Sequence, residues 1–150
     1  MVVVLQTPAI MLHPHELAKT ATPLFDDHEQ IKKVYADYWE EVFKGSTELK
    51  TFYASQELQG GYSGMRFMKD HYQPFYLTSA GATFVFTEVS EKVWDILNEP
   101  RRTGLKLPEW AVTDEWYGKT SWQRCPFVPE KGYGDIRVLA RMQNDFPNRC

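Results

Sequence analysis

Residues 31–43 read IKKVYADYWEEVF, and the spacing of the apolar side chains in this stretch decides the fold class. These side chains recur every three or four positions, which places them along one side of an α-helix. Asp26 or Asp27 can cap the start of this helix, and Gly45 can end it. The apolar stripe consists of Ile31, Val34, Tyr35, Tyr38, Trp39, Val42 and Phe43. We therefore predict one long amphipathic helix that packs against a core.

Short segments on both sides of this helix have the character of β-strands. Residues 2–5 (VVVL) are apolar at successive positions, which is typical of a central strand covered on both faces. Residues 83–87 (TFVFT) combine β-branched and aromatic side chains and are the clearest strand. Shorter strands are predicted at 49–54, 65–68, 75–78 and 136–140, and a short helix is predicted to begin at Ser90 as its cap and to end before Pro100. This mixture predicts an α+β fold.

Two long segments, residues 10–25 and 101–129, contain prolines and polar residues and are predicted to be loops. The second is rich in aromatic residues, and Trp110, Trp116 and Trp122 are expected to pin it to the core. A chain of 150 residues with 43% hydrophobic residues can bury a core without disulfides. We expect one domain that spans residues 1–150.

Several classes of protein are excluded by composition. The longest apolar run near the start has four residues, whereas a bilayer requires about 20. The opening MVVVLQTPAI lacks the basic flank of a signal peptide, so a cytoplasmic location is expected. Cys125 and Cys150 have neither CxxC spacing nor an evident base partner, and we interpret them as free thiols. No cofactor is predicted.

Charge limits the ways in which the chain could bind nucleic acid. The formal net charge is −3, which argues against a protein whose whole surface coats RNA. The first 60 residues hold five of the 17 basic and nine of the 20 acidic residues, so the balance is far less acidic in the remainder. Any RNA contact is therefore expected in the second part of the chain.

A metal or acid–base site would most readily use His13 and His15 together with Asp26, Asp27 and His28. The ordinary interpretation is favoured, because histidines that flank a proline in a loop are usually solvated and aspartates before a helix act as caps. The GxSxG, HExxH, P-loop and Rossmann motifs are absent from the sequence. We predict no catalytic residue and no metal site.

Two glycine-rich segments, 60–69 (GGYSGMRFMK) and 131–137 (KGYGDIR), place cations and tyrosines beside flexible backbone. Glycine lets a phosphate approach the backbone, and aromatic rings can stack on bases. The alternative is that these glycines only form turns. The candidate RNA-binding residues are Gly60, Gly61, Tyr62, Arg66, Lys69, Lys131, Gly132, Tyr133, Gly134 and Arg137.

The order of five segments carries a resemblance. Residues 5–9 (LQTPA), 60–62 (GGY), 79–86 (SAGATFVF), 104–108 (GLKLP) and 132–136 (GYGDI) resemble the later portion of RAMP-superfamily proteins. Those proteins are RNA-binding subunits of type III CRISPR effector complexes, and the likeness is nearest to the type III-D kind. The likeness spans most of residues 1–140, and the chain lacks the first of the two domains that such subunits often have.

The resemblance implies a ferredoxin-like or RRM-like domain whose last glycine-rich loop lies close to guide RNA. It also implies a noncatalytic subunit in antiviral defence, with guide RNA and other effector subunits as partners. Two alternatives stay open. One is a guide-processing ribonuclease, which would need a histidine or lysine at the scissile 2′-OH, and the histidines of the chain are His13, His15, His28 and His71. The other is a purely structural module that docks proteins through its aromatic-rich loops.

Overall fold

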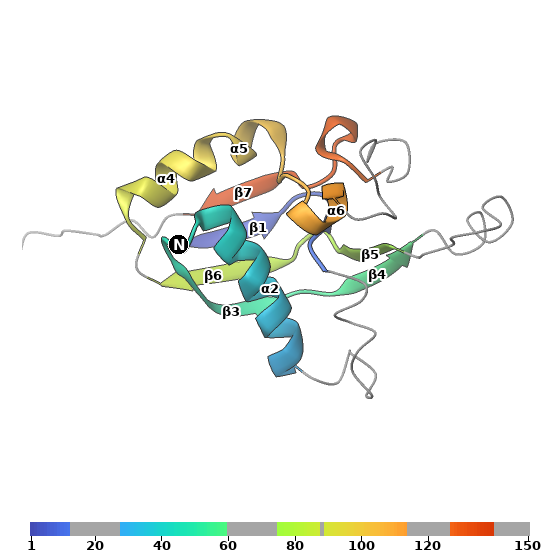
Figure 1. Ribbon diagram of the computed structural model, residues 1–150, viewed down its shortest axis with the longest axis horizontal. Helices are drawn as coiled ribbons and strands as arrows, with labels where there is room; N and C mark the ends of the chain where they lie inside the picture. Colours follow the sequence, from blue (N-terminus) through green and yellow to red (C-terminus); the bar gives the residue numbers. More distant parts are fainter. Residues whose placement is uncertain (13–27, 60–74, 88, 114–126, 140–150) are drawn as a thin grey trace, which may run out of the picture.

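The computed structural model describes residues 1–12, 28–59, 75–87, 89–113 and 127–139 (Figure 1). These form a mixed α+β fold with antiparallel sheets and few helices, which confirms the α+β part of the predicted fold class. The elements are β1 (Val2–Leu5), β2 (Ala9–Ile10), α2 (His28–Phe43), β3 (Glu48–Tyr53), β4 (Gln56–Gln59), β5 (Phe75–Thr78), β6 (Thr83–Thr87), α4 (Glu91–Asn98), α5 (Pro100–Thr103), α6 (Glu109–Thr113), the 3-10 helix η2 (Pro129–Lys131) and β7 (Ile136–Leu139).

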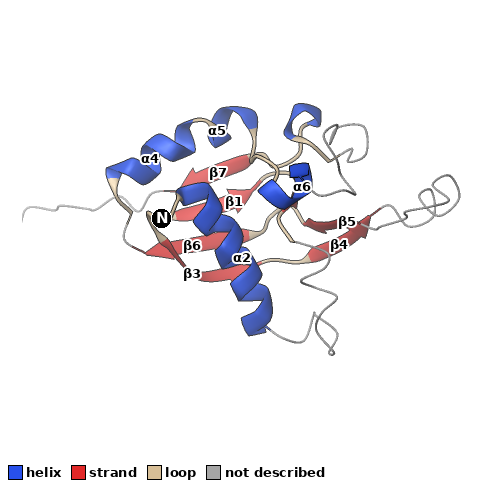
Figure 2. Cartoon of the chain, viewed as in Figure 1, coloured by secondary structure: helices blue, strands red, loops and turns tan. Residues whose placement is uncertain are grey.

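The strands form two antiparallel sheets. The larger has the order β3-β6-β1-β7, and the smaller has the order β2-β5-β4. Figure 2 shows the smaller sheet beyond one end of the larger, where β3 runs on toward β4 and β5 runs on toward β6. The predicted strand at 65–68 lies outside the described residues.

Helix α2 crosses one face of the larger sheet, and an aromatic cluster joins the two (Figure 1). The Trp39 ring stacks on Phe43 with a centroid distance of 5.4 Å. It also meets the rings of Phe84 and Phe86 edge-on, each at 5.2 Å. The helix ends where Lys44 and Gly45 adopt positive φ angles and the Gly45 N–H donates to the carbonyl of Glu40. The predicted caps Asp26 and Asp27 lie outside the described residues.

The structure corrects the prediction that β1 is covered on both faces. Val3 and Leu5 are buried, whereas Val2 and Val4 are only partly buried. The described helices pack on the face that carries Val3 and Leu5, because these two side chains share one core cluster with α2 and α4. Strand β1 is thus central in the sheet, and within the described part of the chain helices cover only one of its faces.

The region around Pro100 also differs from its prediction. Ser90 occupies the N-cap position of α4, but its side chain makes no capping hydrogen bond. Glu99 has helical φ and ψ angles, and the chain continues directly into α5 with Pro100 at its first position. Proline fits there because the first turn of a helix has no partner for its N–H.

The predicted loops contain short elements. Ala9–Ile10 forms β2 by pairing with β5, and α5, α6 and η2 lie within or at the end of residues 101–129. Trp110 is partly buried and packs against a second apolar cluster, while Trp116 and Trp122 lie outside the described residues. None of the described helices is both long and apolar enough to cross a membrane.

Replacement of Trp39 by alanine is expected to lower the free energy of unfolding by about 3–5 kcal/mol, as large-to-small changes in a core do. The residue is 1% exposed and touches rings from both α2 and β6. Tyr53→Ala is the control, since that ring is 70% exposed and its loss should change stability by less than about 0.5 kcal/mol. Chemical denaturation measures both, and equal stabilities for the two variants would contradict the packing.

Candidate nucleic-acid interface

The second glycine-rich turn leads from η2 into β7 and is open on one side. Lys131 and Gly132 are exposed. Gly132 has a left-handed conformation with φ of +85°, and a Cβ built on it would meet nothing within 4 Å. Its N–H donates to the carbonyl of Pro129 at 2.8 Å, which holds the turn in place. A ligand could therefore reach the backbone at Gly132 beside the Lys131 ammonium.

Gly134 serves a different purpose two residues later. It is buried, and a Cβ at this position would lie 3.2 Å from the backbone nitrogen and oxygen of Leu105. The Gly134 carbonyl accepts the Leu105 N–H at 2.7 Å, and its own N–H donates to the carbonyl of Pro8 at 2.9 Å. Chain packing alone thus requires glycine at this position. Its contact with RNA stays a prediction.

The two side chains predicted to act beside this turn lie in different surroundings. Tyr133 is half-buried, and its ring meets Phe127 edge-on at a centroid distance of 5.2 Å. Arg137 is exposed on β7. Its register partner on β1 is Val4, which places it on the sheet face opposite the helices. Lys131 and Gly132 therefore form the accessible part of the turn, and Arg137 belongs to another surface.

The first glycine-rich segment connects β4 to β5. These strands pair from Gln56 opposite Thr78 to Gln59 opposite Phe75. The segment between them lies outside the described residues, and so do its candidate contacts Gly60, Gly61, Tyr62, Arg66 and Lys69.

An open cavity of about 750 Å³ lies beside Lys131. Its walls are mainly apolar, and two lysines and one glutamate, Lys106, Lys131 and Glu130, are among the residues that line it. The lining consists of Lys106, Leu107, Val112, Val128, Pro129, Glu130 and Lys131. Lys106 was not predicted as a contact, because it is 25 positions from Lys131 and no local pattern connects the two.

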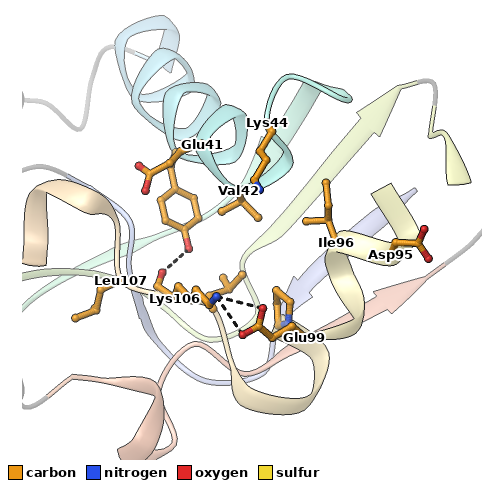
Figure 3. Close-up of a pocket in the computed structure, with 11 residues that line it drawn as sticks. Glu41, Val42, Lys44, Asp95, Ile96, Glu99, Lys106 and Leu107 are labelled. Carbon is orange, nitrogen blue, oxygen red and sulfur yellow. Dashed lines mark hydrogen bonds and ion pairs between the residues drawn. The ribbon is translucent and has the colours of Figure 1, made fainter. Parts of the chain in front are cut away.

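A second cavity, of about 320 Å³, lies between α2 and the α4–α5 segment (Figure 3). Lys106 and Leu107 line it as well, so one short segment borders both cavities. The Lys106 ammonium lies 3.0 Å from a carboxylate oxygen of Glu99, as Figure 3 shows, and both side chains are largely exposed. The Tyr38 hydroxyl donates to the carbonyl of Lys106 at 3.2 Å and thereby ties this segment to α2.

Burial changes the acidity of two tyrosines under this surface. Burial raises the pKa of Tyr38, and the nearby Glu41 carboxylate raises it further. Burial also raises the pKa of Tyr35, while the hydrogen bonds that its hydroxyl shares with Thr78 and accepts from the Gln56 side-chain amide lower it in part. Both phenols are neutral at physiological pH and act as hydrogen-bonding core groups.

The described part of the chain assembles no recognisable catalytic or metal-binding group. No cluster of three or more histidine, cysteine, aspartate or glutamate side chains occurs within it. His28 is exposed and its ring stacks on Phe52 at 4.8 Å, which is a packing role at the start of α2. His13, His15 and His71 lie outside the described residues. The described surface thus offers cations and apolar walls.

Comparison of the chain with protein-family models, curated proteins and solved structures gave no match.

Substitution of Gly104 and Gly132 by alanine should separate packing from open space. A Cβ at Gly104 would lie 2.9 Å from the Tyr133 carbonyl oxygen, so we expect Gly104→Ala to lower the free energy of unfolding by more than about 2 kcal/mol. Gly132→Ala should lower it by only about 1–2 kcal/mol, the usual effect of a left-handed alanine. Thermal or chemical unfolding measures both, and an equal or reversed order would contradict the described backbone contact.

Tyr38→Phe should change how stability depends on pH. A folded-state pKa above the ordinary value of about 10 means that the unfolded chain ionises first, so the contribution of Tyr38 is complete below pH 10 and is lost as the pH rises further. At pH 7 the variant should lose about 1 kcal/mol with the hydrogen bond to Lys106. Between pH 10 and 11 its stability should fall less steeply than that of the parent. Parallel curves in denaturant titrations would show that Tyr38 ionises as readily in the folded state.

Proposed function

We propose that the chain is a noncatalytic subunit of an RNA-guided CRISPR antiviral effector complex, a RAMP-superfamily protein of the type III-D kind that contacts guide RNA and neighbouring subunits. The observation that carries the proposal is the topology. The order β1-α2-β3-β6-α4-β7 along the chain, with the sheet order β3-β6-β1-β7, is compatible with a ferredoxin-like domain. Domains of this kind bind RNA on the surface of the sheet and on the loops that connect its strands.

The surface beside Lys131 supports an RNA contact. Phosphates are neutralised by lysine and arginine, and such contacts fix position without reading sequence. Lys131 stands next to the open backbone of Gly132, and Lys106 lies on the same cavity. The apolar walls of Leu107, Val128 and Pro129 could receive the flat face of an unpaired base.

The net charge of the chain determines where binding should be strong. A protein of formal charge −3 repels free RNA at long range. We therefore expect weak binding to isolated RNA at physiological salt and stable binding within the assembly, where neighbouring subunits supply additional cations.

The second candidate is a protein-interaction module without RNA contact. It is favoured by the partly exposed valines Val2, Val4 and Val85 on the sheet face opposite the helices. Apolar side chains in the centre of an exposed face are typical of protein interfaces.

The test is a quadruple variant in which Arg66, Lys69, Lys131 and Arg137 become alanine. We expect the yield of guide RNA in pull-downs of the assembled complex to fall. The slope of log affinity against log salt should also fall by about 0.7 for each phosphate contact that is lost. A normal melting temperature must be shown first.

The matched control replaces four exposed lysines elsewhere, Lys33, Lys44, Lys50 and Lys92, by alanine and so makes the same change in charge. Equal losses of RNA in both variants would show that the effect comes from the change in net charge and not from these four positions. Unchanged yield and unchanged salt dependence in the first variant would leave the interaction module as the better function.

A further inference from the structure

The face of the larger sheet opposite α2 and α4, here called the open face, carries an unusual set of side chains. Strand registers define it, because residues that pair directly across strands point to the same side. Three valines, Val2, Val4 and Val85, occupy its centre on β1 and β6. The open face consists of Val2, Val4, Glu48, Thr51, Tyr53, Thr83, Val85, Thr87, Arg137 and Leu139.

Its side chains fall into rows that run across all four strands. One row is Thr51, Val85, Val2 and Leu139, from β3 to β7. The next is Tyr53, Thr83, Val4 and Arg137. The exposed aromatic ring of Tyr53 and the exposed cation of Arg137 thus lie in one row, at opposite edges of the sheet.

The sequence of β1 indicates that this face is covered by protein. An antiparallel sheet with one face in water alternates apolar and polar residues, whereas a strand buried on both faces is apolar throughout. Residues 2–5 (VVVL) follow the second pattern, although the described residues bury only the side of Val3 and Leu5. Its charged residues lie on the two edge strands, Glu48 on β3 and Arg137 on β7, and the exposed Lys50 stands in the bulge of β3, whereas the centre holds valine and threonine. Depletion of charge at the centre with tyrosine and arginine at the edges is typical of a protein interface.

We propose that the open face binds the open face of a second copy of this chain, around a two-fold axis parallel to the strands and midway between β1 and β6. Sheets stack about 10 Å apart with nearly aligned strands. Rotation about this axis places β3 over β7 of the second copy and β6 over β1. Each row of one copy then lies over the same row of the second copy, with the order of the strands reversed.

The face complements itself under this rotation. Val2 lies over Val85 of the second copy, and Val4 lies over Thr83 of the second copy, so the centre of the interface is apolar. Arg137 lies over Tyr53 of the second copy, and the symmetry repeats this pair at the other edge. A guanidinium over a tyrosine ring is a favourable cation–π contact. The interface therefore pairs its two exposed edge groups and buries no charge at its centre.

This inference concerns another surface from the cavity beside Lys131, and it shares with the proposed RNA contacts only Arg137. In the dimer Arg137 is withheld from RNA, whereas Lys131 stays accessible. Failure of the dimer would leave the RNA contact at Lys131 untouched, and failure of that contact would leave the dimer untouched.

Sedimentation equilibrium of the purified chain, from low to several hundred micromolar, tests self-association. We expect a monomer–dimer equilibrium that Val85→Asp abolishes. Val112→Asp is the matched control, since Val112 is 39% exposed on α6, and it should leave the equilibrium unchanged. Melting curves establish that the variants fold.

Tyr53→Ala is a second variant that cannot disturb the core, because the ring is 70% exposed. We expect it to weaken the dimer by about tenfold, as the loss of two exposed cation–π contacts would. Arg137→Ala should have a similar effect, and the double variant should be no weaker than either single one. A monomer at every concentration, or dimers insensitive to both Val85→Asp and Tyr53→Ala, would overturn the proposal.

Cross-linking tests the arrangement itself, in a background where Cys125 and Cys150 are serine. A short bis-maleimide should join a Tyr53→Cys chain to an Arg137→Cys chain when the two are mixed. Neither variant should cross-link to itself, because like edges lie about three strand spacings, roughly 14 Å, apart across the interface. Cross-links within one variant that match or exceed those in the mixture would exclude the two-fold axis proposed here.

Discussion

The contact of Trp39 with the ring pair Phe84 and Phe86 holds helix and sheet together, and the rest of the structure depends on it. The indole is 1% exposed and also stacks on Phe43 of its own helix. Its Nε1 is buried without a hydrogen-bond partner, which costs about 1–3 kcal/mol. The large apolar area that the ring buries against four other rings, those of Tyr38, Phe43, Phe84 and Phe86, offsets that cost. The position is therefore occupied for shape and apolar area.

A second constraint transmits this packing to the surface beside Lys131. Tyr38 lies on the buried side of α2 next to Trp39, and its hydroxyl donates a hydrogen bond to the carbonyl of Lys106. One residue earlier, Leu105 is fixed by the Gly134 carbonyl, so the 104–107 segment is held between α2 and the turn that leads into β7. The positions of the Lys106 and Lys131 backbones are thus set by core contacts, although their ammonium groups are exposed. A binding surface supported in this way needs little ordering when a ligand arrives.

The sequence predicts an element correctly where local residue preference by itself favours that element. The strand limits at Val2–Leu5 and Thr83–Thr87 follow from runs of β-branched and aromatic residues that local preference already favours. It fails at β2 and at α6, which are too short to carry a period and exist because other segments pair with or pack on them. It also could not separate Gly132 from Gly134, since both stand in one GxG pattern. The structure distinguishes them, because Leu105 packs against Gly134, whereas the space beside Gly132 is open.

The apolar run of β1 shows how a misprediction can carry information. Continuous hydrophobicity predicts burial on both faces, but the helices that the structure describes pack on one face alone. Valine at positions 2, 4 and 85 favours the extended backbone, yet threonine would do so too and would hydrate better. The choice of valine at the centre, with threonines at positions 51 and 87 toward the margin of the face, is understood if water is excluded from the centre and reaches the margin. Water is removed from such a centre only by another apolar surface, so the pattern points to a protein on this face.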